Sequence, residues 1–213
     1  MKKKITSIIM VLAFIVSTFA VFSIPSEAKT TTQKITFRFN GKSATVCKVK
    51  VSGKSVALKG KIMSQKTYMN MFDKAPSKWG GGSYTYDGPV MKGNREVGLT
   101  LLSYYPNKKS SNNYIDFSYE GYEICGIKRG MTEKKAYKKL KKIFGKNNVK
   151  KEKVKKNDNI RKFRENYKSV EYRYVVDGSK GNEKKFVLKV SVGKGKVQAV
   201  ELEAGDYSEL AER

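Results

Sequence analysis

The sequence predicts an α+β protein with an antiparallel, strand-rich N-terminal part followed by one or two units of a helix and a three-strand meander. Three observations favour this fold class. Apolar residues alternate over several short segments, which is the period of a half-buried strand. Gly, Asn, Asp and Pro separate these segments, and two other stretches carry apolar residues at helical spacing. With 39% hydrophobic residues in a chain of 213, there is enough apolar surface for a core.

Residues 29–60 are predicted to form the N-terminal meander of strands. The alternating apolar residues are Ile35, Phe37, Phe39, Cys47, Val49 and Val51. Asn40-Gly41 and Ser52-Gly53 lie between these segments and are typical of tight turns. We therefore expect a β-hairpin or a meander of antiparallel strands at residues 29–60.

Residues 61–125 are predicted to form the first helix-plus-meander unit. Ser64 is expected to start a short helix, which Pro76 and the run Gly80-Gly81-Gly82 would end. Strands are expected at 84–86, 97–102 and 115–119, with a turn at Asp87-Gly88-Pro89.

Residues 126–213 are predicted to form the second unit. Thr132 is the expected N-cap of its helix and Gly145 the residue that ends it. A lysine-rich insertion, residues 146–168, is expected to separate this helix from strands at 172–176, 186–192 and 200–202. The pattern Tyr84-x-x-Asp87-Gly88 recurs as Tyr174-x-x-Asp177-Gly178, which would fit a tandem repeat.

One segment resembles known families. Gly126-Ile127-Lys128-Arg129-Gly130-Met131-Thr132, a helix to Phe144-Gly145, and a meander ending in Lys196-Val197-Gln198-Ala199-Val200 are similar to the β-lactamase inhibitory protein-like and small outer-membrane lipoprotein A-like folds. Exported proteins of Gram-positive anaerobes carry a similar unit at their C-terminal end. The resemblance covers residues 126–202, and residues 64–120 only by the order of elements. It implies a sheet that presents a concave face to a partner protein, without chemistry. The lysine-rich insertion departs from the family pattern, so no contact residues are carried over.

The N-terminus has the features of an export signal. Lys2, Lys3 and Lys4 precede an apolar run at residues 5–24, and small residues follow up to Ala28. We predict a signal peptide at residues 1–28, cleaved after Ala28. The alternative is a retained N-terminal anchor, because about twenty apolar residues also span a membrane. In either case we expect a secreted or cell-surface protein, and the cleaved chain would keep a net charge of +24 out of +26.

The chain contains no histidine, which excludes Ser-His-Asp and Cys-His catalytic sites and His metal sites. Asp87 and Asp177 are conceivable acids, but each precedes glycine in an expected turn, where a carboxylate bonds the local backbone. We therefore expect a protein that is not an enzyme and uses no cofactor or metal. An enzyme with paired carboxylates or a Ser-Lys pair is the least favoured alternative.

Two further features are candidate sites. Trp79 lies in an expected loop beside the glycine run and is the best aromatic contact residue for a ligand. Cys47 and Cys125 could form a disulfide outside the cell, or they could remain two buried thiols. The sequence leaves both states open, because it does not show whether their Cα atoms approach.

The strongest functional signal is the basic stretch of residues 133–164, which contains fifteen Lys or Arg and three acids. Such dense like charge favours an anionic partner. Lysine far outnumbers arginine, which suits diffuse attraction to phosphates better than reading of bases. The predicted polyanion-binding residues are Lys138, Lys139, Lys142, Lys150, Lys151, Lys153, Lys155, Lys156, Arg161 and Lys162.

These observations predict a non-catalytic binding module of the cell envelope that associates with anionic polymers or surfaces. The expected partners are an anionic cell-wall polymer or a membrane surface, with nucleic acid bound only non-specifically. The alternative function is a protein-protein inhibitor or assembly module that binds a partner protein on its sheet face. A third interpretation is that the charge only keeps the protein soluble. The sequence does not indicate an oligomeric state.

Overall fold

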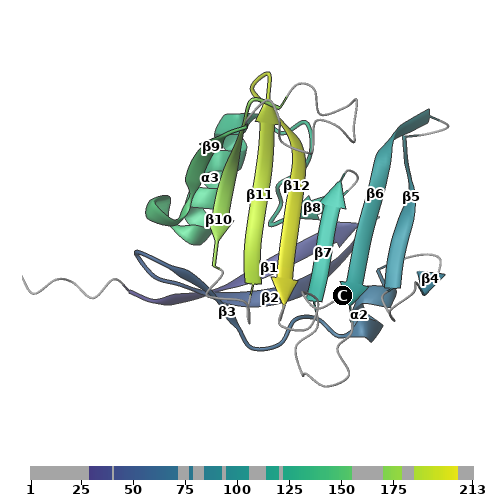
Figure 1. Ribbon diagram of the computed structural model, residues 1–213, viewed down its shortest axis with the longest axis horizontal. Helices are drawn as coiled ribbons and strands as arrows, with labels where there is room; N and C mark the ends of the chain where they lie inside the picture. The colour runs from purple at the N-terminus through teal and green to yellow at the C-terminus, as the bar shows by residue number, and fades with distance from the viewer. Residues whose placement is uncertain are drawn as a thin grey trace, which may run out of the picture.

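The computed structural model describes residues 29–39, 41–71, 77–78, 84–92, 95–105, 114–119, 122–154, 170–178 and 185–205. These residues form two antiparallel sheets and the helices α2 and α3 (Figure 1). Sheet A has four strands in the order β3-β2-β1-β8, and sheet B has eight in the order β4-β5-β6-β7-β12-β11-β10-β9. The prediction of an α+β protein rich in antiparallel strands is confirmed at this level.

Sheet A contains the predicted N-terminal meander. Its strands are β1 (Thr31–Phe39), β2 (Lys42–Val51), β3 (Val56–Lys59) and β8 (Tyr122–Ile124). The predicted alternating apolar residues of β1 and β2 are all buried. Gly41 has a φ of 78°, the left-handed conformation that a two-strand turn favours and that glycine adopts without strain. The edge strand β8 comes from much later in the chain and pairs with β1.

The short helix α2 (Gln65–Met69) begins where it was predicted. The side chain of Ser64 caps it by accepting a hydrogen bond from the Thr67 N–H at 3.2 Å. Tyr68 is fully buried and stacks on Tyr104, with ring centroids 5.2 Å apart. This contact attaches α2 to the first half of sheet B. The strands of that half are β4 (Ser77–Lys78), β5 (Tyr84–Lys92), β6 (Arg95–Tyr105) and β7 (Tyr114–Tyr119).

The predicted turn at Asp87-Gly88-Pro89 is wrong, because these residues lie inside β5 and pair with β6. The strand β4 pairs only with Tyr84 and Thr85. Beyond them, within the described residues, β5 has a neighbouring strand on one side only. Proline has no N–H to donate, so it is tolerated on such an edge. The matching Asp177-Gly178 pair does end a strand, so the two copies of the pattern have different structures.

The second half of sheet B follows the predicted order of helix and strands. Its elements are α3 (Glu133–Phe144), β9 (Lys150–Lys153), β10 (Tyr172–Asp177), β11 (Lys185–Gly193) and β12 (Lys196–Gly205). Thr132 is the N-cap of α3 by position, although its side chain forms no capping hydrogen bond. Gly145 ends the helix with a φ of 79°. The alternating residues Phe186, Leu188, Val190 and Val192 of β11 are completely buried, as their period predicts.

The first part of the predicted lysine-rich insertion, residues 146–153, belongs to the regular fold. Residues 146–148 form a short 3-10 helix, η2 (Lys146–Asn148), and β9 then pairs with β10 at the edge of sheet B. All four residues of β9 are charged and exposed. They form a strand through backbone pairing with β10, whose Tyr174 and Val175 are buried. Edge strands commonly carry lysine, which discourages pairing with other chains. Residues 155–168 of the predicted insertion lie outside the described residues.

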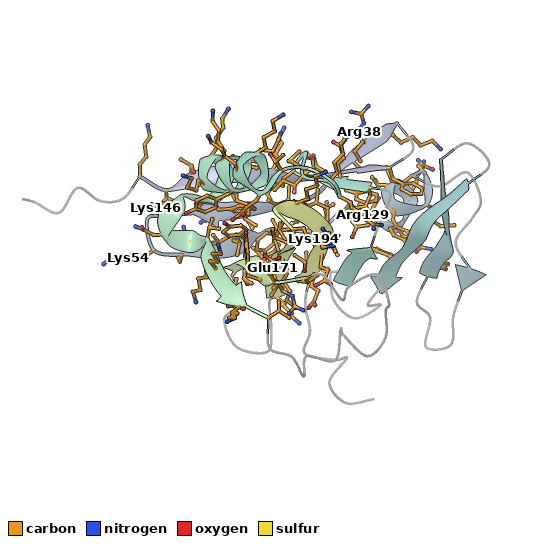
Figure 2. The ribbon with its side chains drawn as sticks, turned by 90° about the horizontal axis from the view of Figure 1, so that it is seen from above. Arg38, Lys54, Arg129, Lys146, Glu171 and Lys194 are labelled. Carbon is orange, nitrogen blue, oxygen red and sulfur yellow. The ribbon has the colours of Figure 1, made fainter. Side chains whose placement is uncertain are left out.

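Helix α3 and sheet A lie on the same side of sheet B, as the view from above shows (Figure 2). The core lies between these layers. The rings of Phe144 in α3 and Phe186 in β11 have centroids 6.0 Å apart, and the Tyr122 hydroxyl of β8 donates to the Val200 carbonyl of β12. None of the helices in the described part of the chain has the length and apolarity needed to span a membrane. The predicted signal peptide, residues 1–28, is outside that part.

Candidate polyanion-binding surface

Helix α3 presents lysines on every side that does not face the core. Its buried residues are Ala136, Leu140 and Phe144, which recur at the helical period and contact the two sheets. The exposed lysines are Lys134, Lys135, Lys138, Lys139, Lys141 and Lys142. Glu133, in the first turn, is the one acidic residue of the helix sequence. The outward surface of α3 is therefore almost uniformly cationic.

Some of the predicted polyanion-binding residues lie together on one surface of the structure, and others lie on different faces. Lys138, Lys139 and Lys142 are exposed together on α3. Lys150, Lys151 and Lys153 are exposed on β9, where successive side chains point to opposite faces. Lys150 therefore lies on one face of sheet B, and the other two lie on the face that carries α3. Lys155, Lys156, Arg161 and Lys162 are outside the described residues.

Lys151 is already engaged within the protein. Its Nζ atom lies 3.5 Å from Glu133 Oε1 and 3.7 Å from the ring centroid of Tyr172. The Tyr174 hydroxyl donates to the same glutamate oxygen at 2.6 Å. The Tyr137 ring of α3 stacks on Tyr174, with centroids 4.8 Å apart. This Glu133 cluster joins the start of α3 to β9 and β10, and it neutralises part of the charge of Lys151.

The contacts of the Glu133 cluster shift the pKa values of its members. Hydrogen bonds from Tyr172 and Tyr174, together with the Lys151 ammonium, lower the pKa of the Glu133 carboxyl. Burial and the hydrogen bond to Glu133 raise the pKa of Tyr172 to about 12, and the same causes raise the pKa of Tyr174. At neutral pH the carboxylate is thus ionised and both phenols are neutral donors.

Replacing Tyr174 by phenylalanine should lower the free energy of unfolding by about 1–2 kcal/mol at pH 7, because the hydroxyl donates to a charged acceptor. The pKa of Glu133 is lower in the folded state than in the unfolded state, so the ionised carboxylate stabilises the fold at any pH above the ordinary glutamate pKa. This stabilisation is lost as the pH falls through the pKa of Glu133 in the folded state. The effect of Tyr174→Phe should therefore shrink in acid.

Urea unfolding of the wild type and the variant at neutral and acidic pH measures this difference. Tyr137→Phe is the matched control, because within the described chain the Tyr137 hydroxyl has no hydrogen-bond partner while its ring belongs to the same stack. An equal loss for the two variants, or a loss that does not change with pH, would contradict the assigned hydrogen bond.

The two cysteines are free thiols in this structure, so of the two states that the sequence left open it shows the one without a disulfide. Cys47 is buried in β2, and Cys125 follows β8 with a φ of 53°. Burial raises the pKa of both thiols, that of Cys125 to about 11. The reactive form of cysteine is the thiolate, so the raised pKa values disfavour it for both thiols at neutral pH.

The other candidate residues do not form a site in the described chain. Trp79 lies outside the described residues. Asp177 is exposed at the end of β10. No group of three or more cysteine, aspartate or glutamate side chains with metal-binding geometry occurs within the described residues.

Two groups of residues were missed by the sequence analysis. The members of the Glu133 cluster are up to 41 positions apart, so only tertiary packing brings them together. The second group consists of basic residues near the N-terminus, and counting charged residues in the sequence would have found it. Residues 29–71 contain ten basic residues and no acid, and six of the ten lie in the strands of sheet A. The ten are Lys29, Lys34, Arg38, Lys42, Lys48, Lys50, Lys54, Lys59, Lys61 and Lys66.

Comparison of the chain with protein-family models, with curated proteins and with solved structures gives no match. The resemblance of residues 126–202 to β-lactamase inhibitory protein-like folds therefore stays an expectation from sequence motifs.

Proposed function

We propose that the protein is an exported, non-catalytic binding module of the cell envelope that associates with anionic polymers or surfaces through the lysine-rich face of α3. The observation that carries this proposal is the outward surface of the helix, with six exposed lysines. The only acid of the helix, Glu133, is occupied by Tyr174 and Lys151. Concentrated positive charge attracts polyanions, and binding is favoured by the release of their counterions.

The chemistry of the cations favours phosphate or carboxylate groups over specific bases. All six cations of α3 are lysines, which act as flexible point charges, whereas base reading usually requires the planar fork of arginine. The partner in this proposal is therefore recognised by its charge density. We place the protein outside the cytoplasmic membrane on the strength of the predicted signal peptide at residues 1–28.

The alternative of a partner protein on the sheet face has weaker support. On the side of sheet B that faces away from α3, four side chains of β10, β11 and β12 are buried, although an open docking face would expose them. They are Val175, Val187, Ser191 and Ala199. An apolar protein interface would also resist salt, which separates it from polyanion binding.

The triple variant Lys138→Gln, Lys139→Gln, Lys142→Gln tests the proposal. We expect its affinity for a phosphate polymer at low salt to fall on the order of tenfold, and the slope of log affinity against log salt to become about two shallower. The control carries Lys54→Gln, Lys66→Gln and Lys196→Gln, which remove the same charge from the β2–β3 turn, α2 and the start of β12. Binding is measured by fluorescence anisotropy of a labelled polymer.

Equal losses in the two triple variants would show that only net charge matters, and would contradict a site on α3. Unchanged binding in both would remove the proposal.

We also propose that the two halves of sheet B are copies of one unit. The strand order runs outward from the β7–β12 pair as β7-β6-β5-β4 on one side and β12-β11-β10-β9 on the other. A helix precedes each group, although α2 has five residues and α3 has twelve. This symmetry of the strand order supports the copy hypothesis more strongly than the recurrent Tyr-x-x-Asp-Gly pattern does.

A further inference from the structure

The register of sheet A places three lysines in one row. Lys34 of β1 lies directly opposite Lys48 of β2, and Lys48 lies directly opposite Lys59 of β3. Neighbouring strands are about 4.8 Å apart, so the row spans about 10 Å. Like charges directly opposite each other destabilise a sheet. A row that breaks this rule without an acid to neutralise it is the kind of local conflict that function commonly maintains.

The row is exposed and unneutralised. All three lysines are exposed, whereas the intervening Ile35 and Val49 face the core. Within the described part of the chain, none of the three forms an ion pair. Lys59 Nζ instead donates to the Thr32 hydroxyl of β1 at 3.4 Å. The Lys59 side chain therefore extends from β3 across the outer face of β2.

A hollow of about 370 Å³ lies beside the row, between β2 and the segment that follows β3. Residues 45–48 and 59–63 line it, and they include Lys48, Lys59 and Lys61 but no acid. Its shape comes from an irregularity in the β1–β2 pairing at Val46, whose carbonyl accepts a hydrogen bond from the Met63 N–H. The hollow is large enough for a small anionic group, and its lining combines these three lysines with the apolar residues Val46, Ile62 and Met63.

The composition of this outer face discriminates between anionic partners. The side chains around the lysine row are Thr32, Thr36, Arg38, Ser43, Thr45, Lys50, Ala57 and Glu123. Hydroxyl groups are good donors to phosphate oxygens. Among the residues that the structure describes, this face has no aromatic side chain on which a base could stack and no large apolar side chain that could enter a membrane. The one acid among its described side chains, Glu123, forms an ion pair with Lys128 at 3.3 Å.

We propose that the outer face of sheet A is a second anion-binding surface, which binds consecutive phosphates of a flexible phosphodiester polymer without bases, such as a poly(glycerol phosphate). The row formed by Lys34, Lys48 and Lys59 contacts successive phosphates, and the hollow beside Lys61 receives one phosphate group. This surface shares only its ligand class with the proposed function of α3. Arg38 and the outward side chains of α3 extend to the same side of the molecule (Figure 2), so one polymer can contact both surfaces.

The test is the triple variant Lys34→Gln, Lys48→Gln, Lys59→Gln, with the Lys54, Lys66 and Lys196 triple variant as the charge-matched control. The probe is a labelled poly(glycerol phosphate) of uniform length. We expect on the order of tenfold weaker binding at low salt and a salt slope about two shallower, while the control stays close to the wild type. Thermal unfolding should be unchanged or shifted upward, because the substitutions remove repulsion within the sheet.

Two further probes identify the source of the phosphate. Oligothymidylate of equal charge should bind no better than poly(glycerol phosphate), and vesicles of phosphatidylglycerol should bind more weakly. Preferential loss of vesicle binding or of oligothymidylate binding in the sheet A variant would overturn the proposal in favour of a membrane or a nucleic acid. A sheet A variant that binds the polymer like the wild type would also overturn it.

The two triple variants test the two surfaces separately, because each removes lysines from one surface only. Loss of binding in the sheet A variant with full binding in the α3 variant would support this inference and contradict the proposed function of α3. The reverse result would contradict the inference alone. Arginine at the three positions, which keeps the charge, should retain the affinity.

Discussion

Replacing Phe186 by alanine is expected to lower the free energy of unfolding by about 3–5 kcal/mol, the largest effect of any single substitution considered for this protein. Phe186 is completely buried in β11. Its ring contacts Phe144 of α3, and its Cβ atom lies within 3.4 Å of the position that a Cβ on Gly178 would take. It therefore packs where α3 and the β3 end of sheet A meet sheet B. A cavity at this point removes contacts from all three elements.

Urea unfolding followed by circular dichroism measures this loss. Phe186→Leu is the control, because it keeps most of the side-chain volume and should cost under about 1.5 kcal/mol. An alanine variant with nearly wild-type stability would show that α3 does not pack on β11. The affinity of the same variant for a phosphate polymer should also be measured, because the arrangement of the α3 lysines depends on the packing of α3 against Phe186.

Replacing Gly178 by alanine is expected to destabilise the protein by about 1–3 kcal/mol or more through overpacking. A Cβ atom at this position would lie 2.6 Å from the carbonyl oxygen of Val56 and 3.1 Å from its carbonyl carbon. Both atoms belong to the backbone of β3, which is held by its pairing with β2 and cannot rotate aside like a side chain. The substitution must therefore move sheet A relative to sheet B.

Gly195→Ala is the matched control for this substitution. Gly195 has a φ of 67°, so alanine there carries the usual left-handed penalty of about 1–2 kcal/mol, but its Cβ meets nothing within 4 Å. Gly178→Ala should lower the urea midpoint at least as far, because its Cβ meets the fixed backbone of β3. If Gly178→Ala were neutral, the close approach of β3 to the end of β10 would be wrong.

Local patterns were sufficient to predict most of the elements. The alternation in 35–51 and 186–202, the capping serine at 64 and the glycine at 145 all have local causes, namely strand period, side-chain capping and left-handed backbone. Asp87-Gly88-Pro89 was mispredicted because its structure depends on a long-range fact. Only its pairing with β6 makes these residues part of a strand.

The candidate site was predictable in part. The cationic face of α3 follows from helical periodicity, which is a local property. The pairing of Lys34 with Lys48 and of Lys48 with Lys59 depends on strand register, which local propensity does not fix. The absence of acids from residues 29–71 was nevertheless available in the sequence, and it would have directed attention to sheet A.

The salt dependence of binding tests the central claim, that the cationic surfaces of α3 and sheet A recognise a phosphate polymer by charge. The measurement is the affinity of the purified protein for poly(glycerol phosphate) over a series of salt concentrations. If about six phosphates are neutralised by the two surfaces, log affinity should fall linearly with log salt with a slope of about −4. A slope near zero, or no binding even in dilute buffer, would contradict the claim.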